Sequence, residues 1–354
     1  MWFSASLGLI DVHTAKSLGF VIAAAFLAAA GTPAQEPVPL TAEAINAASL
    51  ASIPAAFAPA VVPAEGATET PTPVINLPDP AVVRLQVLLD RAGSSPGAID
   101  GFDGDNVRKA VVGFELMAGL PADGLIDPDL IARIDSDEPV IGAYTVLPDD
   151  SADVTGPVPE DYADKAKMQF LGYATIDEKL AERFHMDIDL LHALNPGATY
   201  AAGEQILVAA YGPDKTGEVA RIEADKGNRQ VRAYDAAGTL LVAYPATIGS
   251  EDNPSPSGTH LVDAVAPMPN YTYNPKINFQ QGDNTEVLTI PPGPNGPVGS
   301  MWIDLTEPTF GIHGTPEPSK IDKTGSHGCV RLTNWDATEL AAMVKAGVPV
   351  EFVG

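Results

Sequence analysis

Residues 311–315 read GIHGT and residues 325–332 read GSHGCVRL, and these two stretches decide what the chain can be. Cys329 is the only cysteine among 354 residues, so no disulfide can form within the chain. A thiol attacks a carbonyl as the thiolate, so a nucleophilic cysteine needs a base within hydrogen-bond reach. His313 stands 16 positions before the cysteine and His327 two positions before it, and both are candidates for that base.

The positions of the two histidines favour different roles. Residues two apart in an extended segment point to the same face, so His327 is expected beside the sulfur. His313 is expected at the end of a neighbouring strand, with a backbone carbonyl on its second ring nitrogen. Gly328 has no side chain where a substrate carbonyl must approach, and its N–H is expected to form an oxyanion hole with that of Cys329.

Two other roles for these residues stay open on the sequence alone. A lone cysteine is most often a small buried apolar residue. His313, His327 and Cys329 are also three side chains of the types that bind zinc, but the nearby sequence offers no clear fourth ligand and no carboxylate base. We therefore predict no metal and no cofactor.

The C-terminal half predicts a β-rich domain with one main helix. The runs RIEAD (221–225), QVRAYD (230–235) and LLVAYPATIG (240–249) alternate in polarity and are separated by turn residues, which is typical of hairpins. The helix is expected in NWDATELAAMVKAG (334–347), where Thr333 and Asp336 can cap its start.

Two smaller modules are expected before this domain. Residues 81–135 predict a three-helix domain, because amphipathic stretches alternate with Asp-Gly turns. Residues 166–212 predict a small α/β module, with a helical pattern followed by a short apolar strand at 205–208. The Pro- and Ala-rich segment 35–80 and the acidic segment 136–165 are predicted to be linkers.

The N-terminus and the net charge indicate the compartment and the partners. Residues 18–30 (LGFVIAAAFLAAA) are too short to span a bilayer, so we predict that residues 1–34 are a signal peptide of an exported protein. No stable membrane span is expected. The formal charge of −26 would repel phosphates, which argues against a nucleic-acid partner.

The pairing of IHGT with SHGCVRL closely resembles the L,D-transpeptidase catalytic (YkuD) domain, over about residues 219–352 within a domain placed at 217–354. The resemblance implies that Cys329 is the nucleophile and His313 the proton donor and acceptor. It also implies that His327 and Ser326 shape the pocket and that Arg331 anchors the pocket or a substrate carboxylate. Asp322 departs from the pattern, which has glycine there. Further substrate-binding residues are expected at Thr315, Tyr273 and Trp302.

The two upstream modules carry weaker resemblances. Residues 81–135 resemble a peptidoglycan-binding type 1 domain through Leu85-Gln86, Asp100-Gly101 and Asp123-Gly124, and residues 166–212 resemble a degenerate LysM module. Together the resemblances imply a periplasmic or envelope enzyme of cell-wall biogenesis and cell shape, open to acylation by carbapenems. It would act on peptidoglycan tetrapeptide stems through a thioester, with a second stem or an envelope protein as acceptor. A carboxypeptidase or endopeptidase on the same fold, or a non-catalytic wall-binding protein, is the alternative.

Overall fold

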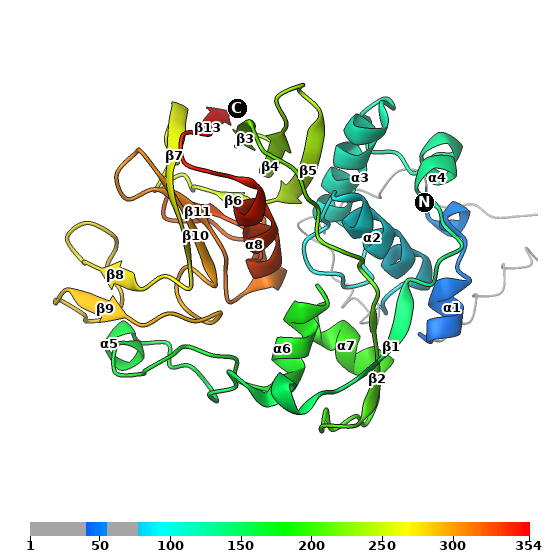
Figure 1. Ribbon diagram of the computed structural model, residues 1–354, viewed down its shortest axis with the longest axis horizontal. Coiled ribbons are helices and arrows are strands. Elements are labelled where there is room, and N and C mark those ends of the chain that lie inside the picture. Colours follow the sequence, from blue (N-terminus) through cyan, green and yellow to red (C-terminus); the bar gives the residue numbers. More distant parts are fainter. Residues whose placement is uncertain (1–39, 55–76) are drawn as a thin grey trace, which may run out of the picture. The chain divides into compact units, whose positions relative to one another are not determined.

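The computed structural model describes residues 40–54 and 77–354 (Figure 1). The predicted signal peptide, residues 1–34, lies outside the described residues. None of the described helices is long and apolar enough to cross a membrane.

The first described part of the chain is helical. It contains α1 (Ala42–Asn46), η1 (Leu50–Ser52), α2 (Pro80–Ala92), α3 (Asp105–Ala118) and α4 (Pro128–Ile134). Asp79 caps α2 by accepting from the N–H of Ala81 at 2.7 Å, and Gly93 ends the helix in the left-handed conformation, with φ of 89°. The apolar faces of these helices form one buried core, as the amphipathic pattern predicts.

Part of the segment 35–80, predicted to be a linker, is folded. Ile45 in α1, Leu50 in η1 and Ile53 are buried in the core that also contains α2. Removing these side chains from water stabilises the segment against the helices, and this outweighs its high proline and alanine content.

A small α/β module follows the helices, but it begins earlier than predicted. Its elements are β1 (Ile141–Thr145), η2 (Pro148–Ser151), α5 (Tyr162–Lys165), α6 (Ile176–Arg183), α7 (Ile188–Leu194) and β2 (Gln205–Ala209). β1 pairs antiparallel with β2, with Ile141 opposite Ala209 and Thr145 opposite Gln205.

The prediction of an acidic linker at 136–165 is therefore wrong for β1 and for the turn that follows it. Asp150 shows why the acidic composition misleads. Its carboxylate is buried, accepts hydrogen bonds from Tyr144 Oη and Leu147 N at 2.8 Å each, and pairs with Arg183. A carboxylate with these partners is part of a folded structure rather than of a solvated chain.

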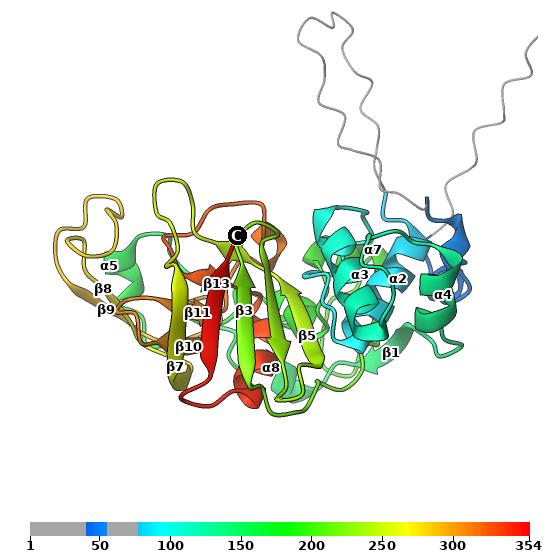
Figure 2. The same cartoon turned by 90° about the horizontal axis from the view of Figure 1, so that it is seen from above.

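The C-terminal part is the predicted β-rich domain, and its nine-stranded sheet has the order β5-β4-β3-β13-β7-β10-β11-β12-β6. Figure 2 shows several of these strands side by side. Only Ala246 separates β5 from β6, although these strands stand at opposite ends of the sheet order, so the sheet must curve round on itself like a barrel. The strands are β3 (Arg221–Asp225), β4 (Gln230–Tyr234), β5 (Leu240–Pro245), β6 (Thr247–Ile248), β7 (Gly258–Pro267), β10 (Met301–Leu305), β11 (Gly311–His313), β12 (Val330–Arg331) and β13 (Pro349–Val353).

A main helix, a separate hairpin and a short 3-10 helix complete this domain. The main helix α8 (Asn334–Met343) begins as predicted, with Thr333 Oγ1 accepting from the N–H of Asp336 at 3.1 Å. A separate hairpin pairs β8 (Tyr271–Tyr273) with β9 (Leu288–Ile290), and η3 (Pro318–Lys320) precedes the cysteine loop.

Candidate active site

The sheet brings the two decisive stretches of sequence together. β11 and β12 are parallel neighbours, with Ile312 opposite Val330 and His313 opposite Arg331. The N–H of Leu332 donates to the carbonyl of His313 at 2.8 Å. Cys329 directly precedes β12, so the cysteine and His313 reach the same region of the sheet although 16 residues separate them in sequence.

A cavity of about 400 Å³ opens at this point. Five of the predicted site residues line it together with Cys329: His313, His327, Ser326, Arg331 and Trp302. Its other walls include four aromatic residues that the sequence did not single out, namely Tyr162, Tyr271, Phe279 and Phe310.

His313 has the geometry of a neutral base. Its side chain is buried, and its Nδ1 lies 2.6 Å from the carbonyl of Gly314, so Nδ1 must carry the hydrogen and Nε2 is left to accept one. The ring stacks on Trp302, with centroids 5.5 Å apart. Burial, with the nearby positive charge of Arg331, lowers the pKa of His313 to about 4, so the ring is neutral near pH 7.

The thiol of Cys329 is also held in its neutral form. Burial raises the pKa of Cys329, and a hydrogen bond from the Gly311 backbone together with the charge of Arg331 partly offsets that effect. The sulfur lies 3.6 Å from the carbonyl oxygen of Thr309. A neutral thiol that shares a cavity with a neutral imidazole favours proton transfer at the moment of attack over a preformed ion pair.

His327 packs differently from His313. Its ring lies flat on that of Phe279, with centroids 3.9 Å apart and an interplanar angle of 12°. Burial, and then the charge of Arg331, lowers the pKa of His327. These contacts suit a residue that shapes the cavity wall.

Ser326 organises the backbone around Cys329. Its hydroxyl donates to the carbonyl of Cys329 at 2.6 Å and accepts from the N–H of Gly249 at 2.8 Å and of Gly328 at 3.3 Å. The expectation that Gly328 offers a free N–H to an oxyanion hole is therefore not met in this structure, because Ser326 already takes that hydrogen. The N–H of Cys329 has no acceptor among the described residues.

Gly328 is instead required by its backbone. Its φ is +105°, and a Cβ at this position would lie 2.6 Å from the ring of Phe310. No residue with a side chain fits there without strain. Its carbonyl accepts from Ser255 Oγ at 2.6 Å, which fixes the peptide before Cys329.

Arg331 is a cation without a partner in the described part of the chain. It lines the cavity, and none of the hydrogen bonds or ion pairs among residues 40–54 and 77–354 involves its guanidinium. Burial lowers the pKa of Arg331, but the guanidinium keeps its proton and its positive charge. A half-buried guanidinium on the cavity wall suits the carboxylate of a bound molecule.

The structure does not bring Tyr273 or Thr315 into the cavity wall. Tyr273 is fully buried, and its hydroxyl accepts from the N–H of Gln281 at 2.9 Å. Thr315 is buried too, and its hydroxyl accepts from the N–H of Glu317 at 3.2 Å. Tyr271 lines the cavity in place of Tyr273. The alternating sequence YTY could not separate the two, because residues two apart share a face.

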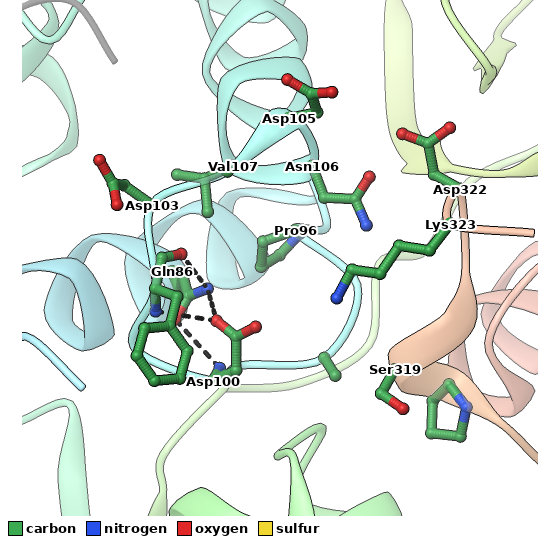
Figure 3. A pocket seen from close by; sticks show the side chains of 14 residues that line it. Gln86, Pro96, Asp100, Asp103, Asp105, Asn106, Val107, Ser319, Asp322 and Lys323 are labelled. Atoms are coloured by element: carbon green, nitrogen blue, oxygen red, sulfur yellow. Dashed lines mark hydrogen bonds between the residues drawn. The ribbon is translucent and has the colours of Figure 1, made fainter. Parts of the chain in front are cut away.

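A second cavity, of about 250 Å³, lies between the helical region and the loop before the cysteine (Figure 3). Gln86 joins the predicted Leu-Gln and Asp-Gly motifs there, since its Nε2 donates to Asp100 Oδ1 at 2.8 Å. Asp322 and Lys323 approach from the other side. Asp322 has φ of +66°, which explains why glycine suits this position, and its carboxylate pairs with Lys109 and Arg229.

No cysteine or histidine is among the residues lining this second cavity, whereas Cys329, His313 and His327 all line the first. In neither described range, 40–54 or 77–354, do three or more His, Cys, Asp or Glu side chains group as metal ligands.

Comparison with known proteins assigns the family. Residues 220–352 match the family model of the L,D-transpeptidase catalytic domain (YkuD), and residues 78–134 match that of the peptidoglycan binding domain. The chain belongs to the L,D-transpeptidase family, with an N-terminal peptidoglycan-binding domain. The LysM-like identity of residues 166–212 stays a prediction.

Two Bacillus proteins, whose names place them among the L,D-transpeptidases as YkuD, illustrate the relationship. The protein of Bacillus licheniformis is 30% identical over 177 residues, which cover 49% of this chain and 90% of that protein. The protein of Bacillus subtilis is 46% identical over 173 residues, which cover 48% of this chain and 89% of that protein.

Among solved structures, an L,D-transpeptidase from Mycobacterium smegmatis is 20% identical, with a TM-score of 0.33. The match covers 44% of this chain and 65% of that one, and a likeness of this size carries no argument about the fold.

Proposed function

We propose that this protein is an exported cysteine transpeptidase that acts on peptidoglycan tetrapeptide stems through a thioester. One arrangement carries the proposal: a cavity in which Cys329 shares the wall with a neutral His313, oriented by the Gly314 carbonyl, and with the unpaired Arg331. These are a nucleophile, a base and a carboxylate anchor, the three parts that acyl transfer from a charged peptide needs.

In the acylation step, Nε2 of His313 takes the thiol proton as the sulfur of Cys329 attacks the carbonyl of the third stem residue. The C–S bond forms, the carbonyl oxygen becomes negative, and the N–H of Cys329 is the donor placed to stabilise it. His313 then returns the proton to the leaving nitrogen. The amide bond breaks, the terminal D-Ala leaves as a neutral amine, and the thioester remains.

The second step distinguishes three products. An amine that attacks the thioester gives its proton to His313, forms a new amide and releases the thiol. A diamino acid of a second stem would give a 3→3 cross-link, and a lysine of an envelope protein would give a covalent anchor. Water would make the enzyme a carboxypeptidase or, on cross-linked stems, an endopeptidase.

The upstream modules support a role in the cell envelope. The peptidoglycan-binding domain would hold the enzyme on its polymeric substrate and raise the local concentration of stems. The order β1, α6, α7, β2, with the two strands paired, is compatible with a LysM-like module at 166–212, whose opening strand then lies at 141–145. A wall-binding protein without catalysis would not need Cys329 and His313 together in a cavity.

Intact-mass spectrometry with a stem tetrapeptide tests the proposal. We expect the wild-type protein to gain the mass of the acyl tripeptide on Cys329 and to release D-Ala. Chromatography of the products with and without a diamino-acid acceptor then separates transfer from hydrolysis. Release of D-Ala without any covalent adduct, and at the same rate in Cys329→Ala, would contradict the mechanism.

A further inference from the structure

One wall of the catalytic cavity comes from outside the matched catalytic domain. Tyr162 opens α5, well before residue 220, yet it lines the cavity with Cys329. Figures 1 and 2 both show α5 beside the hairpin of β8 and β9, and residues of α5 contact β9. The segment 158–173 therefore belongs to the site in space, although the sequence analysis placed it in a linker and a separate module.

The ring of Tyr162 is the centre of an aromatic cluster. It meets Tyr273 at 5.1 Å, Phe279 at 6.0 Å and Tyr271 at 6.1 Å between centroids, each nearly edge-on. Phe279 in turn stacks on His327 at 3.9 Å. A continuous row of rings therefore runs from Tyr162 to the residue two positions before the nucleophile.

Polar contacts tie the same segment to the loop 274–287, which joins β8 to β9. The N–H of Tyr162 donates to Gln281 Oε1 at 3.1 Å, and Gln281 Nε2 donates to the carbonyl of Glu160 at 3.3 Å. Asn284 Nδ2 donates to Asp161 Oδ2 at 3.1 Å. The loop that carries Phe279 thus rests on residues 160–162 through both side chains and backbone.

The far end of the segment is fixed as firmly. Leu171 is fully buried, its N–H donates to the carbonyl of Pro292 at 2.8 Å, and its carbonyl accepts from the N–H of Asn295 at 3.0 Å. The chains approach so closely that a Cβ on Gly293 would lie 2.1 Å from the carbonyl oxygen of Leu171. The segment 158–173 is therefore fixed at both ends, by the loop 274–287 at residues 160–162 and by residues 292–295 at Leu171. A segment fixed in this way can support the loop 274–287.

We propose that Tyr162 is a positioning residue of the active site, which holds the loop 274–287 and His327 in place over the cavity and so governs how tightly a stem peptide binds. The inference rests on the proposed function for the identity of the substrate. The ring, through its edge-on contacts, carries the effect, because the described residues offer its hydroxyl no hydrogen-bond partner.

The test compares Tyr162→Ala, Tyr162→Phe and Tyr234→Ala. Tyr234 is the matched control, a half-buried tyrosine of the same chain whose ring stacks on Arg221 and does not line the cavity. The rate of thioester formation against tetrapeptide concentration gives KM and kcat. Limited trypsin digestion, scored by the fragment that ends at the exposed Lys276, reports the freedom of the loop without any substrate.

Tyr162→Ala should raise KM about ten-fold, with a smaller change in kcat, and should speed cleavage after Lys276, because several aromatic pairs are lost. Tyr162→Phe and Tyr234→Ala should match the wild type in both measurements. Unchanged KM or unchanged cleavage in Tyr162→Ala overturns the inference, and so do equal effects in Tyr234→Ala. If the wild type forms no thioester, the proposed function fails, and the cleavage rates alone decide whether Tyr162 holds the loop.

Discussion

The stretch 311–332 and the segment 141–182 both contribute to the candidate active site and its surroundings, but they do so in different ways. The first carries the reactive groups in two short motifs, which adjacent parallel strands bring together. The second carries no reactive motif and is rich in acids. Its Tyr162 nevertheless lines the cavity, and its Glu182 accepts a hydrogen bond from Asn334, the first residue of α8. The reactive groups thus lie in short local motifs, whereas one residue of the cavity wall, Tyr162, comes from the acidic segment that was predicted to be a linker.

The largest expected effect falls on the first region. Cys329→Ala should abolish thioester formation, because no other thiol exists in the chain, while the fold is kept, because alanine fits a small site. Mass spectrometry after incubation with tetrapeptide or with a carbapenem checks this, and circular dichroism checks the fold. An adduct that persists in the variant would place the nucleophile elsewhere.

Within the same region, the two histidines should differ. His313→Gln removes the group that accepts and returns the proton, so the acylation rate should fall on the order of 10²-fold or more. His327→Gln loses a stacking contact with Phe279 and should cost much less. Stopped-flow acylation of both variants makes the comparison, and normal acylation by His313→Gln would reverse the roles.

The segment 141–182 should affect how the free energy of unfolding depends on pH. Glu182 is half-buried, accepts from Asn334 Nδ2 at 3.0 Å and from Tyr173 Oη at 3.1 Å, and the loss of water around its carboxyl raises its pKa to about 7. Between the unfolded pKa and that value, the folded protein keeps a proton that the unfolded chain has released. The free energy of unfolding should therefore fall as pH rises through this window, by about 3 kcal/mol from this group.

Glu182→Gln keeps the acceptor but has no proton to lose, so it should remove that part of the pH dependence. Urea unfolding at pH 5 and pH 8 measures the change, with Glu317→Gln, an exposed residue paired with Lys320, as the control. Equal slopes of stability against pH in the wild type and Glu182→Gln would mean that the carboxyl is ionised in the folded state.

The smallest expected effect concerns the pH dependence of the acylation rate, which should be nearly flat. Because the pKa of His313 is lowered to about 4 and that of Cys329 is raised, neither group changes its protonation between pH 5 and 8. The rate of acylation should vary by no more than about two-fold over that range. An acylation rate that falls as the pH is lowered through 6.5 would show that a histidine with an ordinary pKa controls the reaction.

The sequence by itself determined the catalytic family, the peptidoglycan-binding domain, the cysteine and the two candidate histidines. These features depend on residues close together in sequence, whose types are dictated by chemistry or by backbone conformation, such as Gly328 with its positive φ. The β-rich fold followed for the same reason, since alternation of polarity is a local signal.

Only the tertiary structure decided which tyrosine of the YTY run lines the cavity, that Ser326 occupies the N–H of Gly328, and that Tyr162 reaches the site. Each of these features depends on contacts between segments far apart in the chain. The amino-acid composition of a segment predicts that it is solvated only when no other segment packs on it. The acids of residues 136–165 suggested a solvated linker, but the contacts of Asp150 with Tyr144, Leu147 and Arg183 make this carboxylate part of the folded structure.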